Sequence, residues 1–188
     1  MVGEMRGDAI TVADVGTLAV KERIPFDAGV RPFAATTDGQ TLYAQVSNFE
    51  GYIVYDRKLG TVTRRVELPK TAKSRAYHGT FPKDAAHHGI SLFPGDKELC
   101  IAATASDYAA LVASDGDRTE AIIPVGAGPS WTVTSPDGTV CFVSSREANT
   151  VSVLSRAEKK EIKRIAVGNY PQRMILARLA GTCHAVSR

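Results

Sequence analysis

An internal repeat of about 42 residues constrains the fold of this chain more than any other feature of its sequence. The turn Ser-Pro-Asp-Gly at 135–138 precedes an apolar pair at 142–143, and the related turn Phe-Pro-Gly-Asp stands 42 residues earlier, at 93–96. A third turn, Thr-Asp-Gly at 37–39, leads into another apolar pair. Tight turns between short apolar runs predict β-hairpins, so the repeat predicts a chain of short antiparallel strands.

A second set of strand ends recurs in phase with these turns and defines the length of the unit. Asp14, Asp56, Ser114 and Ser155 stand 42, 58 and 41 residues apart, and about 16 extra residues in an insert at 69–87 explain the long spacing. Four short strands in a unit of this length are typical of a β-propeller blade, whereas a β-sandwich does not require the whole four-strand order to repeat. We therefore predict an all-β fold, a β-propeller of four-stranded antiparallel blades with about four blades. The repeat units of this single domain, 1–188, are approximately 9–50, 52–105, 109–147 and 150–179.

The order of these elements resembles the YVTN-type β-propeller repeat family, which is WD-repeat-like in its blade pattern. The resemblance rests on Pro-Asp-Gly at 136–138, Phe-Val-Ser at 142–144, Asn-Thr-Val-Ser-Val-Leu at 149–154 and Ile-Ala-Val-Gly at 165–168. It covers about residues 9–179. Members are usually seven-bladed, mostly exported or surface-associated, and often without a known activity, and some related propellers carry haem, copper or quinone chemistry. The resemblance therefore implies a repeat protein that is exported or surface-associated, and it is informative about fold and not about function.

Only about four units are present where the resemblance implies seven, and a fan of four blades would leave two apolar flanks in water. The favoured explanation is that the chain is the C-terminal part of a longer propeller, since Pro171 runs into one last strand while the N-terminus looks cut. Two alternatives stay open. A second copy could complete the ring as a homodimer through the exposed flanks, or the four blades could close as a compact ring.

The repeat also predicts where a ligand would bind. In a propeller the innermost strand of each blade lines the axial channel, and the loop that enters it lies at the channel mouth. Counting back from each turn places polar and aromatic residues at this rim: Arg31, His87, His88, Ser130, Trp131, Gln172 and Arg173. Apolar walls with a few convergent polar groups are the usual description of a ligand site. For Trp131 a core position is the competing interpretation, and for the two arginines it is pairing with carboxylates.

Chemistry at this rim has a weaker basis in the sequence. His78 and His88, with His87 beside them, could gather as ligands for copper or zinc, but no carboxylate or cysteine spacing completes a metal pattern. The sequence also lacks a Gly-x-Ser-x-Gly elbow, a phosphate-binding glycine loop and a Cys-x-x-Cys-His haem motif. We therefore expect a non-catalytic interaction module that needs no cofactor. The alternative is a metal- or cofactor-dependent propeller related to oxidoreductases.

Composition adds limits on partners and compartment. A net charge of +3 over 188 residues is a weak field, so we expect a protein or small-molecule partner and no nucleic acid. No apolar run is long enough for a membrane span, and no signal peptide is visible. Cys100, Cys141 and Cys183 are too few and too scattered to predict a disulfide framework. The sequence itself assigns no compartment, although the family resemblance suggests export.

Overall fold

The computed structural model describes residues 1–76 and 86–177, and these form fifteen strands and one short helix. The helix, α1 (Ala72–Ala76), lies within the insert of the repeat. Bounds of the strands, in chain order, are β1 (Val2–Glu4), β2 (Ala9–Ala13), β3 (Val20–Pro25), β4 (Val30–Ala35), β5 (Thr41–Val46), β6 (Gly51–Asp56), β7 (Thr61–Glu67), β8 (Ile90–Leu92), β9 (Glu98–Ala103), β10 (Tyr108–Ala113), β11 (Thr119–Pro124), β12 (Pro129–Thr134), β13 (Val140–Ser145), β14 (Thr150–Ser155) and β15 (Lys160–Ala166).

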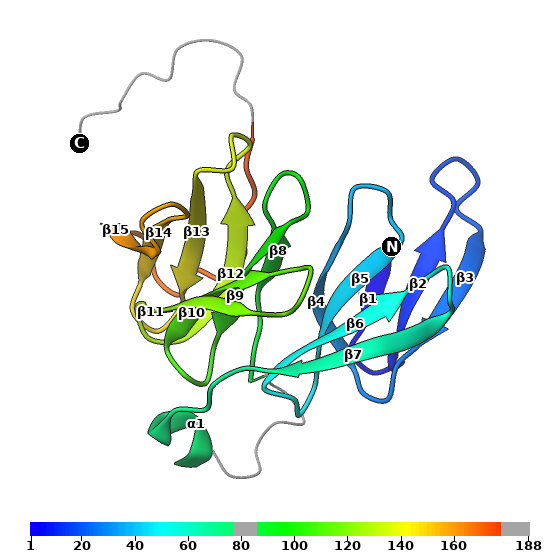
Figure 1. The fold of residues 1–188 in the computed structure, drawn as a ribbon, viewed down its shortest axis with the longest axis horizontal. Helices are drawn as coiled ribbons and strands as arrows, with labels where there is room; N and C mark the ends of the chain where they lie inside the picture. Colours follow the sequence, from blue (N-terminus) through cyan, green and yellow to red (C-terminus); the bar gives the residue numbers. More distant parts are fainter. Residues whose placement is uncertain (77–85, 178–188) are drawn as a thin grey trace.

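The strands form four sheets, and within each sheet every strand pairs antiparallel with the strand that precedes or follows it in the sequence. The first has the order β1-β2-β3, and the others are β4-β5-β6-β7, β8-β9-β10-β11 and β12-β13-β14-β15. The sheets follow one another in chain order, from the first, in blue, to the fourth, in orange (Figure 1). The strands that begin the second, third and fourth sheets contact one another in succession, β4 against β8 and β8 against β12. The prediction of an all-β chain of antiparallel sheets is confirmed, and their arrangement is propeller-like.

The turns explain why the sequence forms these hairpins. Asp14 and Asp56 each accept hydrogen bonds from backbone N–H groups two and three residues further on, and each closes the outer hairpin of its sheet. All four outer hairpins carry a register shift near the turn. The inner turn of the third sheet has its residues in the order Pro-Gly-Asp, and it places Gly95 at φ 88° and Asp96 at φ 58°. Because aspartate tolerates the left-handed region, this altered turn still closes a hairpin.

The sheets do not begin where the repeat units were placed. The first three units defined from the sequence each contain the last two strands of one sheet and the first two of the next, and the fourth contains the last two strands of the fourth sheet. The boundaries of the units therefore differ from those of the sheets. The insert also contains α1, where the sequence showed no convincing helix. Ser74 and Thr71 exchange hydrogen bonds at its start. Five residues are too few to show helical periodicity, which explains the omission.

The core is divided among the interfaces between successive sheets. Ile10 and Ile24 of the first sheet pack with Leu42 and Ile53 of the second, and similar apolar clusters lie between the second and third and between the third and fourth. The strands β9 and β10 are buried along their whole length. The third sheet, like the second, therefore lies between two neighbouring sheets.

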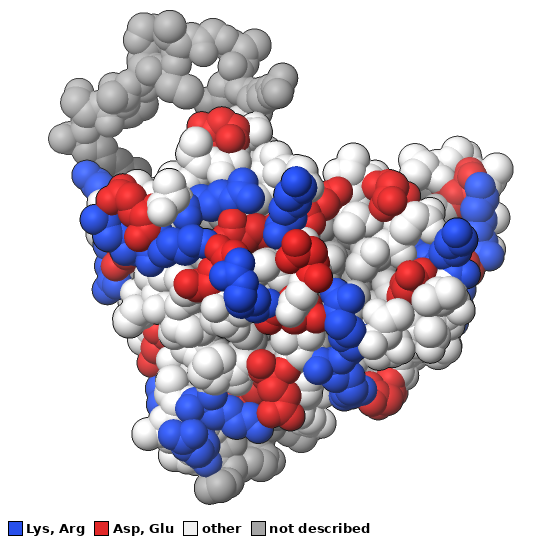
Figure 2. Space-filling view, in the orientation of Figure 1, with Lys and Arg blue, Asp and Glu red and all other residues white. Residues whose placement is uncertain are grey.

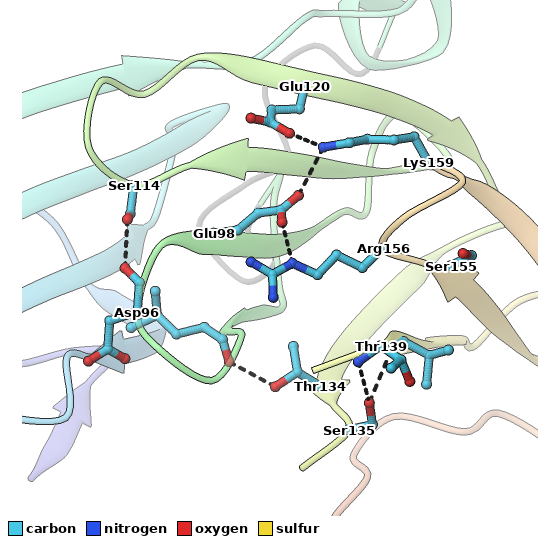
Figure 3. A network of polar contacts seen from close by, with 12 residues as sticks. Asp96, Glu98, Ser114, Glu120, Thr134, Ser135, Thr139, Ser155, Arg156 and Lys159 are labelled. Carbon is cyan, nitrogen blue, oxygen red and sulfur yellow. Dashed lines mark hydrogen bonds and ion pairs between the residues drawn. The ribbon is translucent and has the colours of Figure 1, made fainter. Parts of the chain in front are cut away.

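Covalent and ionic contacts add to the apolar interface between the third and fourth sheets. Cys100 on β9 and Cys141 on β13 form a disulfide, which the sequence analysis did not predict. At the start of β9, two residues before Cys100, Glu98 contacts Arg156 and Lys159 of the fourth sheet's outer turn (Figure 3). The sequence analysis missed the disulfide because the two cysteines come together only when successive repeats stack.

Candidate functional site

A cavity of about 330 Å³ opens where the first strands of the sheets approach one another. Residues of all four sheets and of the segment after β15 surround it. The lining consists of Gly3, Met5, Val30, Arg31, Pro32, Phe33, His88, Ile90, Trp131, Thr132 and Arg173. Four of the seven rim residues predicted from the repeat are therefore brought together around one space: Arg31, His88, Trp131 and Arg173. We call this space the central cavity.

Arg31 is the buried cation of the central cavity. Its side chain extends from β4 and is only 6% exposed. The guanidinium donates a hydrogen bond to the Ser47 hydroxyl at 3.2 Å and contacts the Met5 sulfur at 2.8 Å. These contacts hold the guanidinium at the cavity wall.

His88 presents a defined tautomer to the central cavity. Its Nδ1 lies 3.0 Å from the carbonyl oxygen of Ser130. A carbonyl only accepts hydrogen bonds, so Nδ1 carries the proton and Nε2 of the neutral ring keeps its lone pair. Burial lowers the pKa of His88, although the bond to Ser130 acts in the opposite direction. The ring is therefore neutral near pH 7, and a ligand that donates a hydrogen bond could use Nε2.

Trp131 forms the aromatic wall of the central cavity, and both a histidine ring and a cation lie close to its indole. The His88 ring lies 6.1 Å from the indole at an interplanar angle of 49°, and the Arg173 guanidinium lies 5.7 Å from the ring centroid. A cation at this distance from an indole is attracted to its π face. Arg173 is itself exposed, so the cation beside the indole is accessible to solvent.

Three other predicted rim residues do not line the central cavity. The His87 ring is fully buried and lies edge-on against Tyr108. Ser130 donates its hydroxyl hydrogen bond to the carbonyl of Gly128, and the carbonyl of Gln172 accepts one from Ser144. Alternation along an extended chain explains the split between His87 and His88, whose side chains point to opposite sides.

The metal hypothesis gains no cluster from the part of the chain that is described. His78 lies outside the described residues, and His87 is directed away from His88. Within residues 1–76 and 86–177, no three His, Cys, Asp or Glu side chains are grouped closely enough to hold a metal ion.

Sequence reasoning missed the apolar part of the cavity wall. Val30, Pro32 and Phe33 lie on the same strand as Arg31, while Met5 comes from the connection before β2. These three residues could have been found from the sequence, because they are the neighbours of the predicted rim residue Arg31 on its strand. Met5 lies outside the repeat pattern, so no periodic signal marks it.

Burial of His87 predicts a loss of stability in mild acid. Desolvation lowers the pKa of His87 to about 3, while an unfolded histidine titrates near 6.5. Between these values the unfolded chain binds a proton that the folded chain does not, so the free energy of unfolding falls as the pH drops. The slope from this one group approaches about 1.4 kcal/mol per pH unit. Urea denaturation of the wild type and of His87→Phe gives the free energy of unfolding at each pH from 7 to 4. The contribution of His87 is the difference between the two plots of this free energy against pH. Parallel plots would show that His87 does not cause the loss of stability in acid.

Comparison with known proteins supports the fold and leaves the family open. No protein-family model matches the chain, and no curated protein matches it in sequence. Among solved structures it is similar to hydrazine synthase from Kuenenia stuttgartiensis, with a TM-score of 0.70 over 87% of this chain at 16% identity. The chain spans only 44% of that protein chain. The likeness is one of fold alone, so the chain is an all-β protein with propeller-like sheets.

No helix in the described ranges has the length and hydropathy that a membrane crossing needs.

Proposed function

We propose that the chain is a non-catalytic binding module that takes a small anionic ligand in the central cavity. The observation that carries the proposal is the lining itself, which combines Arg31, Arg173 and a neutral histidine with aromatic and aliphatic walls. No aspartate or glutamate is among the residues that line this space. The chemistry of the lining therefore favours a ligand with negative charge.

The volume and the walls of the central cavity limit the kind of anion. About 330 Å³ lies at the small end of the range for small-molecule sites. Trp131 and Phe33 offer flat apolar surfaces beside the two guanidinium groups, and guanidinium groups bind carboxylates through paired hydrogen bonds. A carboxylate attached to a small flat ring combines these features, so we take aromatic carboxylates as the ligand class.

The surface charge supports a small ligand over a nucleic acid. Figure 2 shows basic and acidic side chains interleaved over one face of the molecule. Ion pairs join basic and acidic side chains of the described residues, as in Lys73 with Asp107, Arg65 with Asp27, and Arg118 with Glu120. Basic side chains that are paired with acidic ones do not form the uniform basic stripe that binding of a phosphate backbone requires.

Trp131 is the only tryptophan of the chain, so its fluorescence reports on the central cavity directly. Titration with benzoate is expected to change this emission in a saturable way, while benzyl alcohol, which lacks the charge, is expected to bind much more weakly. The Arg173→Gln variant should weaken benzoate binding about tenfold, because a hydrogen bond to a charged group contributes about 1.5–3 kcal/mol.

A matched control separates the cavity from general surface charge. Arg118→Gln removes the same charge from a side chain that is 73% exposed on a different part of the surface, and it should leave benzoate affinity unchanged. Equal weakening by Arg118→Gln and Arg173→Gln, or equal binding of benzoate and benzyl alcohol, would contradict the proposed anion site.

A further inference from the structure

Among the described residues, the first sheet contains no strand that corresponds to the one that begins every other sheet. Its hairpin, β2–β3, corresponds to the outer hairpins β6–β7, β10–β11 and β14–β15, since all four carry the same register shift before the turn. β1 pairs with β2 as β5 pairs with β6, so β1 corresponds to the second strand of a sheet. The position occupied by β4, β8 and β12 in the other sheets is empty beside β1, whose outer edge has no strand partner among the described residues.

The segment at 171–177, after β15, has the opposite character, since it matches a first strand but belongs to no sheet. Pro171 follows Tyr170 at φ 55°, as Pro129 at the start of β12 follows Gly128 at φ 64°. The two segments stand 42 residues apart, the period of the repeat. The sequence analysis expected a last strand here, yet the structure assigns no strand pairing to residues 171–177. We call these residues the terminal strand segment.

A hydrogen bond holds the start of this segment in the first-strand position. The Ser144 hydroxyl of β13 donates to the carbonyl of Gln172 at 2.9 Å. At the equivalent position of β5, Gln45 binds the backbone of Gly89, just before β8. The terminal strand segment is therefore placed where the first strand of a following sheet would lie.

Exposed apolar side chains gather at the same two ends of the described structure. All but three of the large exposed hydrophobic residues lie in or next to the first or the fourth sheet: Met1, Val2, Met5, Val15, Leu18 and Val20 at one end, and Ile162, Ile165, Val167, Tyr170, Ile175 and Leu176 at the other. Ile175 is 88% exposed and Val2 is 62% exposed. Concentrated exposed apolar surface of this kind marks an interaction surface.

We infer that two copies of this chain associate by strand exchange, the terminal strand segment of each pairing with the open edge of β1 in the other. An unpaired strand edge is a template for an added strand. The described residues of each copy offer one open edge and one unmatched strand segment, so a twofold dimer fills both positions. The two copies then form one ring of eight four-stranded sheets. This inference does not depend on the ligand of the central cavity.

The solution mass from light scattering after size exclusion tests the inference. The wild-type chain is expected at twice 20.1 kDa. The double variant Met174→Pro/Ile175→Pro is expected at 20.1 kDa, because proline donates no backbone hydrogen bond and adjacent prolines remove donors from both edges of the strand. The matched control Met174→Ala/Ile175→Ala keeps both donors and should remain largely dimeric.

Each alternative outcome overturns the inference. A wild-type mass of one chain would mean that β1 is left open or is paired within the chain. A mass that rises above two chains would mean that strand addition does not close. A dimer that persists in the proline variant would place the interface elsewhere. Thermal melts of both variants test whether the sheets stay intact. Because Arg173 of the central cavity lies beside the substituted residues, the mass alone and not benzoate binding decides this inference.

Discussion

Loss of the Cys100–Cys141 disulfide is expected to lower the free energy of unfolding by about 4 kcal/mol. The bond joins β9 to β13 across the interface of the third and fourth sheets and closes a loop between residues 41 positions apart. A cross-link of this span restricts the unfolded chain far more than the folded one. Both cysteines are fully buried, so their replacement also removes packed atoms from the core.

Urea denaturation of the wild type and of Cys100→Ala/Cys141→Ala measures this effect, with the oxidised and reduced wild type as a second pair. The reduced wild type should lose nearly as much stability as the double variant. Cys183→Ser is the matched control, because it removes a cysteine that takes no part in the bond. A double variant that unfolds at the same urea concentration as the wild type would show that the disulfide does not stabilise the fold.

Hydrogen exchange locates the same effect. The fourth sheet is covered by its neighbour on one side only within the described structure, whereas the third lies between two sheets. When the disulfide is absent, amide protection should therefore fall most in β13 and β14 and least in β10. Loss of a local constraint lowers the opening free energy of the unit it holds.

The parts of the fold that were predictable are those set by short-range chemistry. Asp14 and Asp56 cap their hairpins with side-chain hydrogen bonds that depend only on residues two or three positions away. A repeat then multiplies each local pattern, so counting from the turns also placed Arg31 and Trp131 beside one cavity. Function at this cavity remains a prediction, since counting fixes a position along a strand and not what binds there.

The features that the sequence did not reveal depend on how one repeat lies on the next. Cys100 and Cys141 meet because their separation of 41 residues is one repeat period, and this match was the signal that could have found them. His87 does not line the cavity as predicted, because the side chain of its neighbour His88 points into the cavity and that of His87 points to the opposite side. The empty position beside β1 was also hidden, since a sequence period shows how many strands recur and not which sheet each one joins.

The ion pair between Glu98 and Arg156 is expected to contribute the second largest effect. Glu98 begins β9, its side chain is only 8% exposed, and its carboxylate accepts a hydrogen bond from Arg156 Nε at 2.6 Å. Lys159 Nζ lies 3.3 Å from the other carboxylate oxygen and also contacts Glu120 (Figure 3). The Arg156 guanidinium lies 4.7 Å from the centroid of the Phe93 ring. One arginine thus joins a buried charge and an aromatic core residue of the third sheet to the outer turn of the fourth.

Arg156→Leu should destabilise the chain by about 3 kcal/mol, because it leaves a buried carboxylate with only one of its two cations. Lys160→Leu is the matched control on the same hairpin. Lys160 pairs with Glu158 where both side chains are more than half exposed, and exposed pairs contribute about 0–1 kcal/mol. Urea denaturation of the two variants at pH 7 therefore compares a buried pair with an exposed one.

A third variant separates the charge from the packing. When Glu98→Leu is added to Arg156→Leu, no buried carboxylate remains, so the double variant should recover part of the stability that Arg156→Leu loses. The recovered part measures the cost of the unpaired charge, and the remainder measures the lost contact with Phe93. If the double variant is less stable than Arg156→Leu alone, Glu98 stabilises the interface without Arg156, and Lys159 is then the cation that matters. Since this contact and the disulfide hold the same pair of sheets, Arg156→Leu should cost more in the reduced protein if the fourth sheet opens as a unit.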